Sequence, residues 1–315
     1  MRKINLLFLS LMLVLITVLT SCDKKSPATP LPPTQASSIA DTEVPAAIEA
    51  PTPEPTLPAN EDPGALMPDP QPITFTTEDG TQISGYYYPG GKDPSPLVVF
   101  MHWMNGDQND WNEVAVWLQN RGLENPFPNP GDLPWWDPSW FPAVPADRSY
   151  AVMVFSFRNC LPYRDGCQSV NKEGWLKDAQ AAMLKAYELE GIDQTRITAI
   201  GSSIGADGAP YGCQKLNEMH PDACQGALSL SPGSYLGIPY EKTVKELGLN
   251  DPATAAWCLA DQSEYFFCEI AESANNPAYQ DFLIQDGSHG NMLLSPNLDP
   301  LPMQLILDFL SDSLQ

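Results

Sequence analysis

The sequence predicts an α/β fold in which helices cover both faces of a mostly parallel sheet. Continuously apolar runs alternate with segments of helical spacing through most of the chain. Two runs, PLVVFMH at 96–102 and YAVMVFSF at 150–157, have the composition of strands buried on both faces. In addition, the motif G-x-S-x-G at 201–205 lies between a predicted strand and a predicted helix. Together these observations predict strand–helix–strand units, which place neighbouring strands in parallel.

The elements follow one another from residue 73. ITFTTEDG and TQISGYYYPG, at 73–90, predict two strands joined by an Asp-Gly turn. A helix that ends in Gly is predicted at 107–122, and the clearest helical spacing in the chain lies at 174–191. The later elements are predicted as strands at 196–202, 226–233, 254–261 and 281–287, and as helices at 204–220 and 302–314.

The first residues are typical of an export signal. A basic head, MRK, precedes an apolar run over 4–19, which is shorter than the roughly 20 apolar residues that cross a bilayer. The run ends in LTSC, which resembles the lipobox of bacterial lipoproteins. That resemblance implies cleavage before Cys22 and a diacylglycerol on its thiol, so the protein is expected outside the cytoplasm, anchored to a membrane of the cell envelope. The alternative is an ordinary signal peptide in which Cys22 is incidental.

Composition divides the chain into three parts. Residues 1–21 are the expected signal peptide. Residues 22–72 are rich in Pro, Ala, Thr and acidic residues and show no hydrophobic period, which predicts a disordered, extended linker. We expect this linker to be a stalk, although a binding tail has the same composition. Residues 73–315 are numerous enough for one domain with a sizeable core.

The charge balance restricts the partners. The chain has 16 basic and 39 acidic side chains, a net charge of -23. Such a surface repels nucleic acid, so no nucleic-acid partner is expected.

Cysteine usage agrees with export. The sequence has seven cysteines, and an even number remains once Cys22 is assigned to the lipid. Pairing between sequence neighbours is the simplest arrangement, although an unpaired, buried Cys258 remains an alternative. The sequence has no C-x-x-C motif and no Cys/His cluster, so no metal site is expected. The candidate pairs are Cys160 with Cys167, Cys213 with Cys224, and Cys258 with Cys268.

The G-x-S-x-G motif has a mechanical interpretation at this place in the chain. Gly201 and Gly205 allow the strand and the helix to approach across a tight turn, which lifts the Ser203 hydroxyl above the carboxyl edge of the sheet. The backbone N–H of Ile204, at the start of the predicted helix, is then a candidate oxyanion donor. Ser203 is therefore a candidate nucleophile.

Several segments resemble the α/β-hydrolase family, over about residues 73–314. VVFMHWMNGDQNDW, VFSFRNC and LKDAQAAM are similar to its third strand and following turn, its fourth strand, and the helix before the nucleophile. LSPG and DGSHGNML are similar to the end of its sixth strand and to its histidine loop. The likeness is to the dienelactone-hydrolase-like and small esterase branches, with Ser in place of the Cys of dienelactone hydrolases. It implies a central sheet of about eight strands.

The resemblance assigns roles to the three histidines. His289, just after the last predicted strand, matches the general base of the family. His102 matches the histidine that braces the oxyanion turn, and the N–H of Met104, or of Trp103, matches the second oxyanion donor. Trp103 stands where family members usually have Gly. His220, at a predicted helix end, is expected to have a capping or surface role.

The family order of nucleophile, acid and histidine places the acid in CLADQSEYF, at 258–266. Alignment on Ala260 favours Glu264, and Asp261 is the alternative. The carboxylate would hold the imidazole in its catalytic tautomer.

We therefore expect a serine hydrolase that cleaves a small-molecule carboxylic ester through an acyl-enzyme, without metal or cofactor. A peptidase or amidase of the same fold, and a non-catalytic binding lipoprotein, remain alternatives. The Trp-rich insertion at 122–148 is expected to pack structurally, with a docking surface or a part of the substrate cleft as alternatives. The sequence leaves the oligomeric state open.

Overall fold

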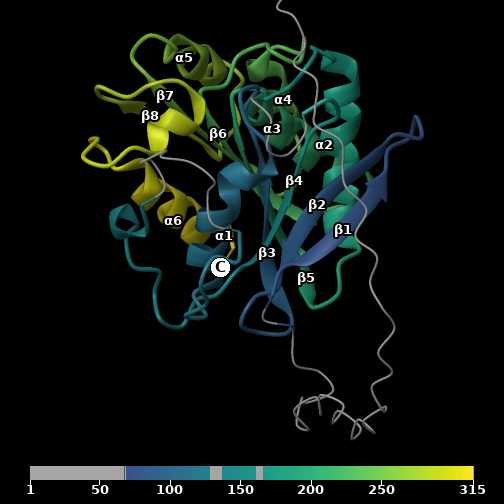
Figure 1. The fold of residues 1–315 in the computed structure, drawn as a ribbon. Helices are drawn as coiled ribbons and strands as arrows, with labels where there is room; N and C mark the ends of the chain where they lie inside the picture. Colours follow the sequence, from purple (N-terminus) through teal and green to yellow (C-terminus); the bar gives the residue numbers. More distant parts are fainter. Residues whose placement is uncertain (1–66, 68, 128–136, 161–165, 315) are drawn as a thin grey trace, which may run out of the picture. The chain divides into compact units, whose positions relative to one another are not determined.

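The computed structural model describes residues 67, 69–127, 137–160 and 166–314. They form one eight-stranded sheet with the strand order β1-β2-β4-β3-β5-β6-β7-β8 (Figure 1). The strands are β1 (Gln71–Thr76), β2 (Gln82–Tyr88), β3 (Ser95–Met101), β4 (Ala151–Phe155), β5 (Ile192–Ser202), β6 (Cys224–Leu230), β7 (Ala255–Asp261) and β8 (Tyr279–Ile284).

The sheet is mostly parallel, as the sequence predicts. β2 pairs antiparallel with β1 and with β4, and all pairs from β4 through β3 to β8 are parallel. Every residue of β4 is buried, and β3 is buried except for one half-buried residue. The continuously apolar composition of these strands follows from helices on both faces, which leave no side of the strand for polar side chains.

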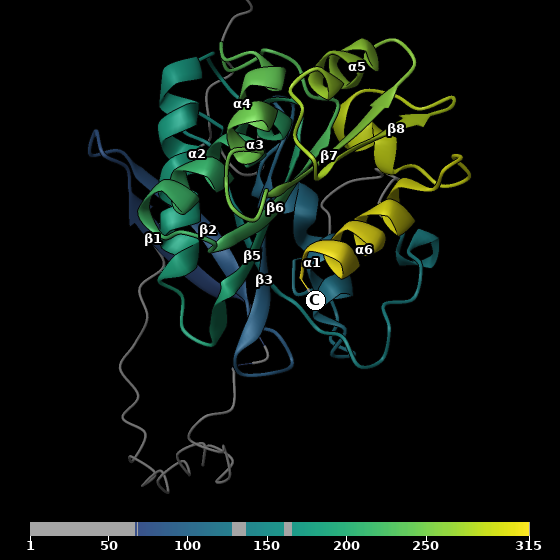
Figure 2. The same ribbon diagram turned by 180° about the vertical axis from the view of Figure 1, so that it is seen from behind.

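Helices cover the two faces unequally. α2, α3, α4 and α5 lie on one face, and α1 and α6 lie on the other (Figures 1 and 2). The helices are α1 (Asn112–Gln119), α2 (Lys172–Tyr187), α3 (Ile204–Met219), α4 (Tyr240–Leu247), α5 (Phe266–Glu272) and α6 (Pro302–Ser313), with 3-10 helices η1 (Gln108–Trp111), η3 (Pro138–Trp140) and η4 (Gly290–Leu294).

Two apolar cores follow from this arrangement. Met183 of α2 and Leu216 of α3 pack into one core beneath their face of the sheet. Leu118 of α1 and Leu310 of α6 pack into the other. Within the described ranges, no helix is both long enough and apolar enough to cross a membrane.

The structure differs from the sequence prediction mainly in short elements. α4 and α5 were not predicted, because each is shorter than the window in which helical period can be recognised. The predicted helix at 107–122 is divided into η1 and α1, and the one predicted at 174–191 begins at Lys172 and ends at Tyr187. β1 begins at Gln71, two residues before the predicted start of the domain. The predicted signal peptide, Cys22 and nearly all of the linker lie outside the described residues.

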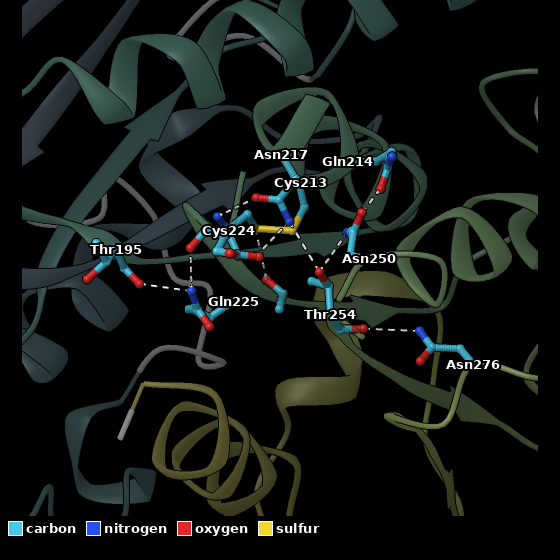
Figure 3. Close-up of a disulfide and its surroundings, with 11 residues drawn as sticks. Thr195, Cys213, Gln214, Asn217, Cys224, Gln225, Asn250, Thr254 and Asn276 are labelled. Carbon is cyan, nitrogen blue, oxygen red and sulfur yellow. Dashed lines mark hydrogen bonds between the residues drawn. A yellow bond between two sulfur atoms is a disulfide. The ribbon is translucent and has the colours of Figure 1, made fainter. Parts of the chain in front are cut away.

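The described residues contain three disulfides, and each joins the sequence neighbours that the cysteine spacing predicts. Cys213–Cys224 links the carboxyl-terminal half of α3 to the first residue of β6 (Figure 3). The Asn217 amide accepts from the Cys224 N–H at 2.8 Å and donates to the Cys224 carbonyl at 2.9 Å. This disulfide therefore ties α3 to the sheet at the amino-terminal ends of the parallel strands.

The described part of the Trp-rich insertion packs on α1. Trp117 of α1 donates from Nε1 to the Pro142 carbonyl at 2.7 Å, and its ring lies 5.3 Å from that of Phe141. These contacts agree with the expected packing role. Trp135 and Trp136 lie outside the described residues.

Candidate active site

Ser203 lies on a strained turn between β5 and α3. Its backbone has φ 53°, a region that residues with a side chain rarely adopt. A Cβ at Gly201 would overlap the Gly205 carbonyl, and one at Gly205 would overlap the Met101 carbonyl. Glycine is therefore required at both flanking positions, because strand and helix pass too closely for any side chain.

The structure brings Ser203, His289 and Glu264 together. His289 Nε2 lies 2.8 Å from Ser203 Oγ, and Nδ1 lies 2.7 Å from Glu264 Oε1. Glu264 follows β7, and His289 lies in the loop after β8, so three parallel strands deliver the three side chains to the carboxyl edge of the sheet. A proton on Nδ1 that is donated to Glu264 leaves Nε2 free to accept from the serine hydroxyl.

Asp261, the alternative acid, has other partners. Its carboxylate accepts from the Ser263 hydroxyl at 2.9 Å, and its backbone carbonyl accepts from the N–H of Glu264 at 3.1 Å. Asp261 therefore closes the turn that presents Glu264. Of the two acids, Glu264 is the one that contacts His289.

The surroundings of Glu264 favour its ionised form. Burial by itself raises the pKa of this carboxyl, but hydrogen bonds from His289, Ser231 and Tyr235 outweigh burial and hold the pKa below its ordinary value. The Tyr235 hydroxyl donates to Glu264 Oε1 at 3.4 Å, and the Tyr235 ring meets the His289 ring edge to face at 5.9 Å. The carboxylate is consequently charged at neutral pH and can stabilise a positive imidazolium.

His102 controls the turn after β3. Its Nε2 accepts from the Phe157 N–H at 3.0 Å, so its proton is on Nδ1, which lies 2.7 Å from the Trp103 carbonyl. Burial lowers the pKa of His102 to about 4, which keeps the ring neutral. The Trp103 carbonyl and the Met104 N–H belong to one planar trans peptide, and His102 therefore orients that N–H away from itself.

A second contact holds the same turn. Cys167 donates its backbone N–H to the Met104 carbonyl at 2.8 Å, and Cys167 is joined to Cys160 beyond β4. Gly166, with φ 77°, lies so close to Met104 and Asn105 that a Cβ would overlap them. The Cys160–Cys167 disulfide, through Cys167 and Gly166, therefore braces the turn from the side of β4.

A buried carboxylate behind the site was not predicted from the sequence. Asp207 of α3 accepts the N–H groups of Gly233 and Leu236 at 2.9 and 3.1 Å, which anchors the loop that carries Tyr235. Burial raises the pKa of Asp207 to about 6, despite these donors. The sequence could have indicated Asp207, because it is an acid among small residues at the start of the predicted helix. No feature of the sequence indicated that Tyr235 lies at the site.

Asp110 connects two loops of the site. Asn291 in the histidine loop donates to its Oδ2 at 3.3 Å, and the Trp103 side chain is a further hydrogen-bond partner. Burial, together with the neighbouring Asp107, raises the pKa of Asp110 to about 8. The sequence did not indicate this contact between loops. Asp110 lies in the first turn of the predicted helix, where acidic residues are common because they stabilise the positive end of the helix dipole.

His220 lies apart from the site. It ends α3 at the amino-terminal edge of the sheet, where its ring stacks on that of Tyr187 at 3.9 Å. This agrees with the expected capping or surface role. In the part of the chain that the structure describes, no group of three or more His, Cys, Asp and Glu side chains is arranged to hold a metal ion.

The strand order, the helices on both faces and the turn at Ser203 define the α/β-hydrolase fold, as the resemblance implied. An esterase of Pyrococcus furiosus shares this fold with a TM-score of 0.51 and 16% identity, over 80% of this chain and 98% of the esterase. An esterase of Pyrobaculum calidifontis gives 0.55 and 13%, over 78% and 86% of the two chains. The dienelactone hydrolase of Anabaena variabilis gives 0.53 and 11%, over 79% and 99%. Comparison of the sequence with protein-family models and with curated proteins finds no match.

Proposed function

We propose that the protein is a serine hydrolase that cleaves a carboxylic ester through Ser203, His289 and Glu264. The observation that carries this proposal is the unbroken chain of contacts from the Ser203 hydroxyl through both imidazole nitrogens to the Glu264 carboxylate. The proposal is also supported by the fold, because two esterases and a dienelactone hydrolase share it.

In the first half of the reaction, Ser203 Oγ attacks the acyl carbonyl while His289 Nε2 takes the hydroxyl proton. The carbonyl oxygen becomes an oxyanion, which the N–H groups of Ile204 and Met104 would hold. Ile204 is the first residue of α3, so its N–H has no acceptor within the helix, and the positive end of the helix dipole adds to the stabilisation. His289 then returns its proton to the leaving alkoxide, and the acyl group stays on Ser203.

In the second half, His289 takes a proton from water, and the resulting hydroxide attacks the acyl-enzyme carbonyl. Collapse of the second oxyanion breaks the bond to Ser203 Oγ, which regains the proton from His289. The products are the free acid and an alcohol. Glu264 keeps the imidazole in one tautomer throughout and stabilises its charged form.

The same proposal includes export. Cleavage before Cys22 and a lipid on its thiol would hold the domain on the cell envelope through the linker of residues 22–72. Three disulfides in the domain are in keeping with an oxidising compartment. Mass spectrometry of the N-terminal peptide tests this part, because a diacylglyceryl mass on Cys22 is expected and an unmodified Cys22 would contradict it.

The enzymatic part is tested on the full chain, expressed with its leader and purified in detergent. A fluorophosphonate probe should label Ser203, and labelling should be absent in Ser203→Ala. A panel of p-nitrophenyl esters, alkyl esters and peptide amides then separates the reaction classes, since an ester is expected to be cleaved and amides much more slowly.

Each outcome discriminates between the functions considered. Cleavage of peptides in preference to esters would identify a peptidase or amidase instead. A folded chain that the probe does not label, and that cleaves nothing in the panel, would identify a non-catalytic binding protein.

A further inference from the structure

The residue that follows β6 has an unusual backbone. Ser231 has φ 56°, and its side chain is fully buried. A glycine would adopt this conformation at a lower free energy, so contacts of the serine side chain have to offset the strain. These contacts lead directly to the candidate active site.

The end of β6 contacts each of the three segments that carry the triad. The Leu230 carbonyl accepts from the Ser203 N–H at 2.9 Å, and the Ser231 N–H donates to the Leu259 carbonyl of β7 at 2.8 Å. The Ser231 hydroxyl accepts from the Gly290 N–H at 2.9 Å. The first two contacts are between main-chain groups, whereas the third depends on a side chain.

The Ser231 hydroxyl also influences the acid. Its oxygen accepts from Gly290, and Ser231 is one of the groups that lower the pKa of the Glu264 carboxyl. One buried hydroxyl thus contacts the backbone beside the base and contributes to the electrostatic environment of the acid.

The histidine loop has little freedom at this point. Gly290 has φ 63°, and a Cβ there would lie 3.0 Å from both Ser202 Oγ and Trp103 Cε3. The loop therefore passes tightly over the strand that carries the nucleophile. Gly290 directly follows His289 in the chain. A small displacement of Gly290 would therefore move His289 relative to Ser203.

We propose that Ser231 is a positioning residue that holds His289 in register with Ser203, through the hydrogen bond that its hydroxyl accepts from the Gly290 N–H. The inference rests on the proposed function, because it assigns a purpose in catalysis to a residue that touches no substrate. A purely structural role, in which the hydroxyl merely satisfies a buried amide, makes different predictions for the variants below.

The test uses Ser231→Gly and Ser231→Ala in the full chain. Both remove the hydroxyl, and only glycine also relieves the backbone strain, so a shared effect on activity reports the hydroxyl. Ser229→Ala is the matched control, since Ser229 is a fully buried serine of β6, two residues before Ser231, and its hydroxyl donates to the Ala206 carbonyl at 2.7 Å.

For both Ser231 variants we expect kcat on the best ester to fall about tenfold, with KM changed less than about twofold. The fluorophosphonate labelling rate should fall in parallel, and amide hydrogen exchange at Gly290 should become about tenfold faster. Ser229→Ala should keep kcat and Gly290 exchange within about twofold of the wild type.

Two results would overturn the assignment of Ser231. One is an unchanged labelling rate in Ser231→Gly, which together with faster Gly290 exchange would show that the hydroxyl only satisfies a buried amide. The other is an equal loss of kcat in Ser229→Ala. A wild-type chain that is neither labelled nor active on any ester would instead overturn the proposed function, and with it the catalytic purpose of Ser231. Gly290 exchange needs no activity, so the two failures are distinguishable.

Discussion

Each of the two edges of the parallel sheet has a disulfide beside a buried polar network. The two networks differ in whether their side chains can carry charge. At the amino-terminal edge, Cys213–Cys224 lies among amides and hydroxyls, with Asn217 and Asn250 both donating to Thr254 Oγ1 (Figure 3). At the carboxyl-terminal edge, Cys160–Cys167 lies beside the turn after β3, and the surrounding network contains imidazoles and carboxylates.

The difference follows from the direction of the strands. In parallel units the helix N-termini and the loops that follow the strands meet at the carboxyl edge, where unpaired N–H groups favour developing negative charge. At the amino edge, helix C-termini arrive, and around Cys213–Cys224 uncharged amide and hydroxyl groups satisfy the backbone. We therefore expect changes at the carboxyl edge to affect activity and its pH dependence, and changes at the amino edge to affect stability alone.

The largest contrast is expected between two single substitutions. Ser203→Ala should lower kcat/KM for the ester by about ten-thousand-fold, because the proposed nucleophile is lost while the fold is kept. His220→Ala, at the amino edge, should leave kcat/KM within about twofold. Steady-state kinetics and a thermal melt of each variant check this, and residual activity of Ser203→Ala above about 1% of wild type would exclude Ser203 as the nucleophile.

The two acids of the loop after β7 give the next contrast. Glu264→Gln should lower kcat by about a hundred- to a thousand-fold, since the amide cannot stabilise an imidazolium. Asp261→Asn should cost less than about fivefold, because its carboxylate contacts Ser263 rather than His289. A larger loss in Asp261→Asn than in Glu264→Gln, measured at neutral pH, would reverse the assignment.

Removal of each disulfide compares the edges directly. Replacing both cysteines by alanine should cost about 2–3 kcal/mol of unfolding free energy for either pair, since the closed loops have similar lengths. Only the Cys160/Cys167 double variant should also lose kcat, by about tenfold, because Cys167 holds the Met104 carbonyl. Urea unfolding and kinetics on both double variants test this, and equal kcat values would show that the disulfide does not support the turn.

The smallest effect is a pH dependence of stability. The pKa of His102 is about 4 in the fold, below the value of about 6.5 expected in the unfolded chain. As the pH falls below 6.5, the unfolded state binds a proton that the folded state does not, so this residue costs about 2 kcal/mol of stability at pH 4.5.

His102→Gln should therefore lose less stability than the wild type between pH 7 and pH 4.5, as measured by urea unfolding. Asn217→Ala, at the amino edge, should lower stability by the same amount at both pH values, because no titrating group is involved. A parallel fall of wild type and His102→Gln with pH would contradict the assigned cause.

Much of the fold could be predicted from the chain alone. The buried strands, the long helices and the turn at Ser203 depend on local composition and spacing, which a linear reading detects. Short helices such as α4 and α5 could not be predicted, because they form where tertiary packing covers one face of a brief and weakly periodic segment.

The sequence by itself indicated a serine, a histidine and a carboxylate for the candidate site, the glycines that the turn needs, and the pairing of neighbouring cysteines as the simplest arrangement. Only the tertiary structure showed that Glu264, and not Asp261, contacts His289, since the two acids lie three positions apart in the chain and the path of the turn selects which carboxylate reaches the imidazole. It also revealed Ser231, Asp110 and Asp207. These residues act across loops that are distant in the chain, and such contacts arise only when parallel strands bring their carboxyl ends to one edge.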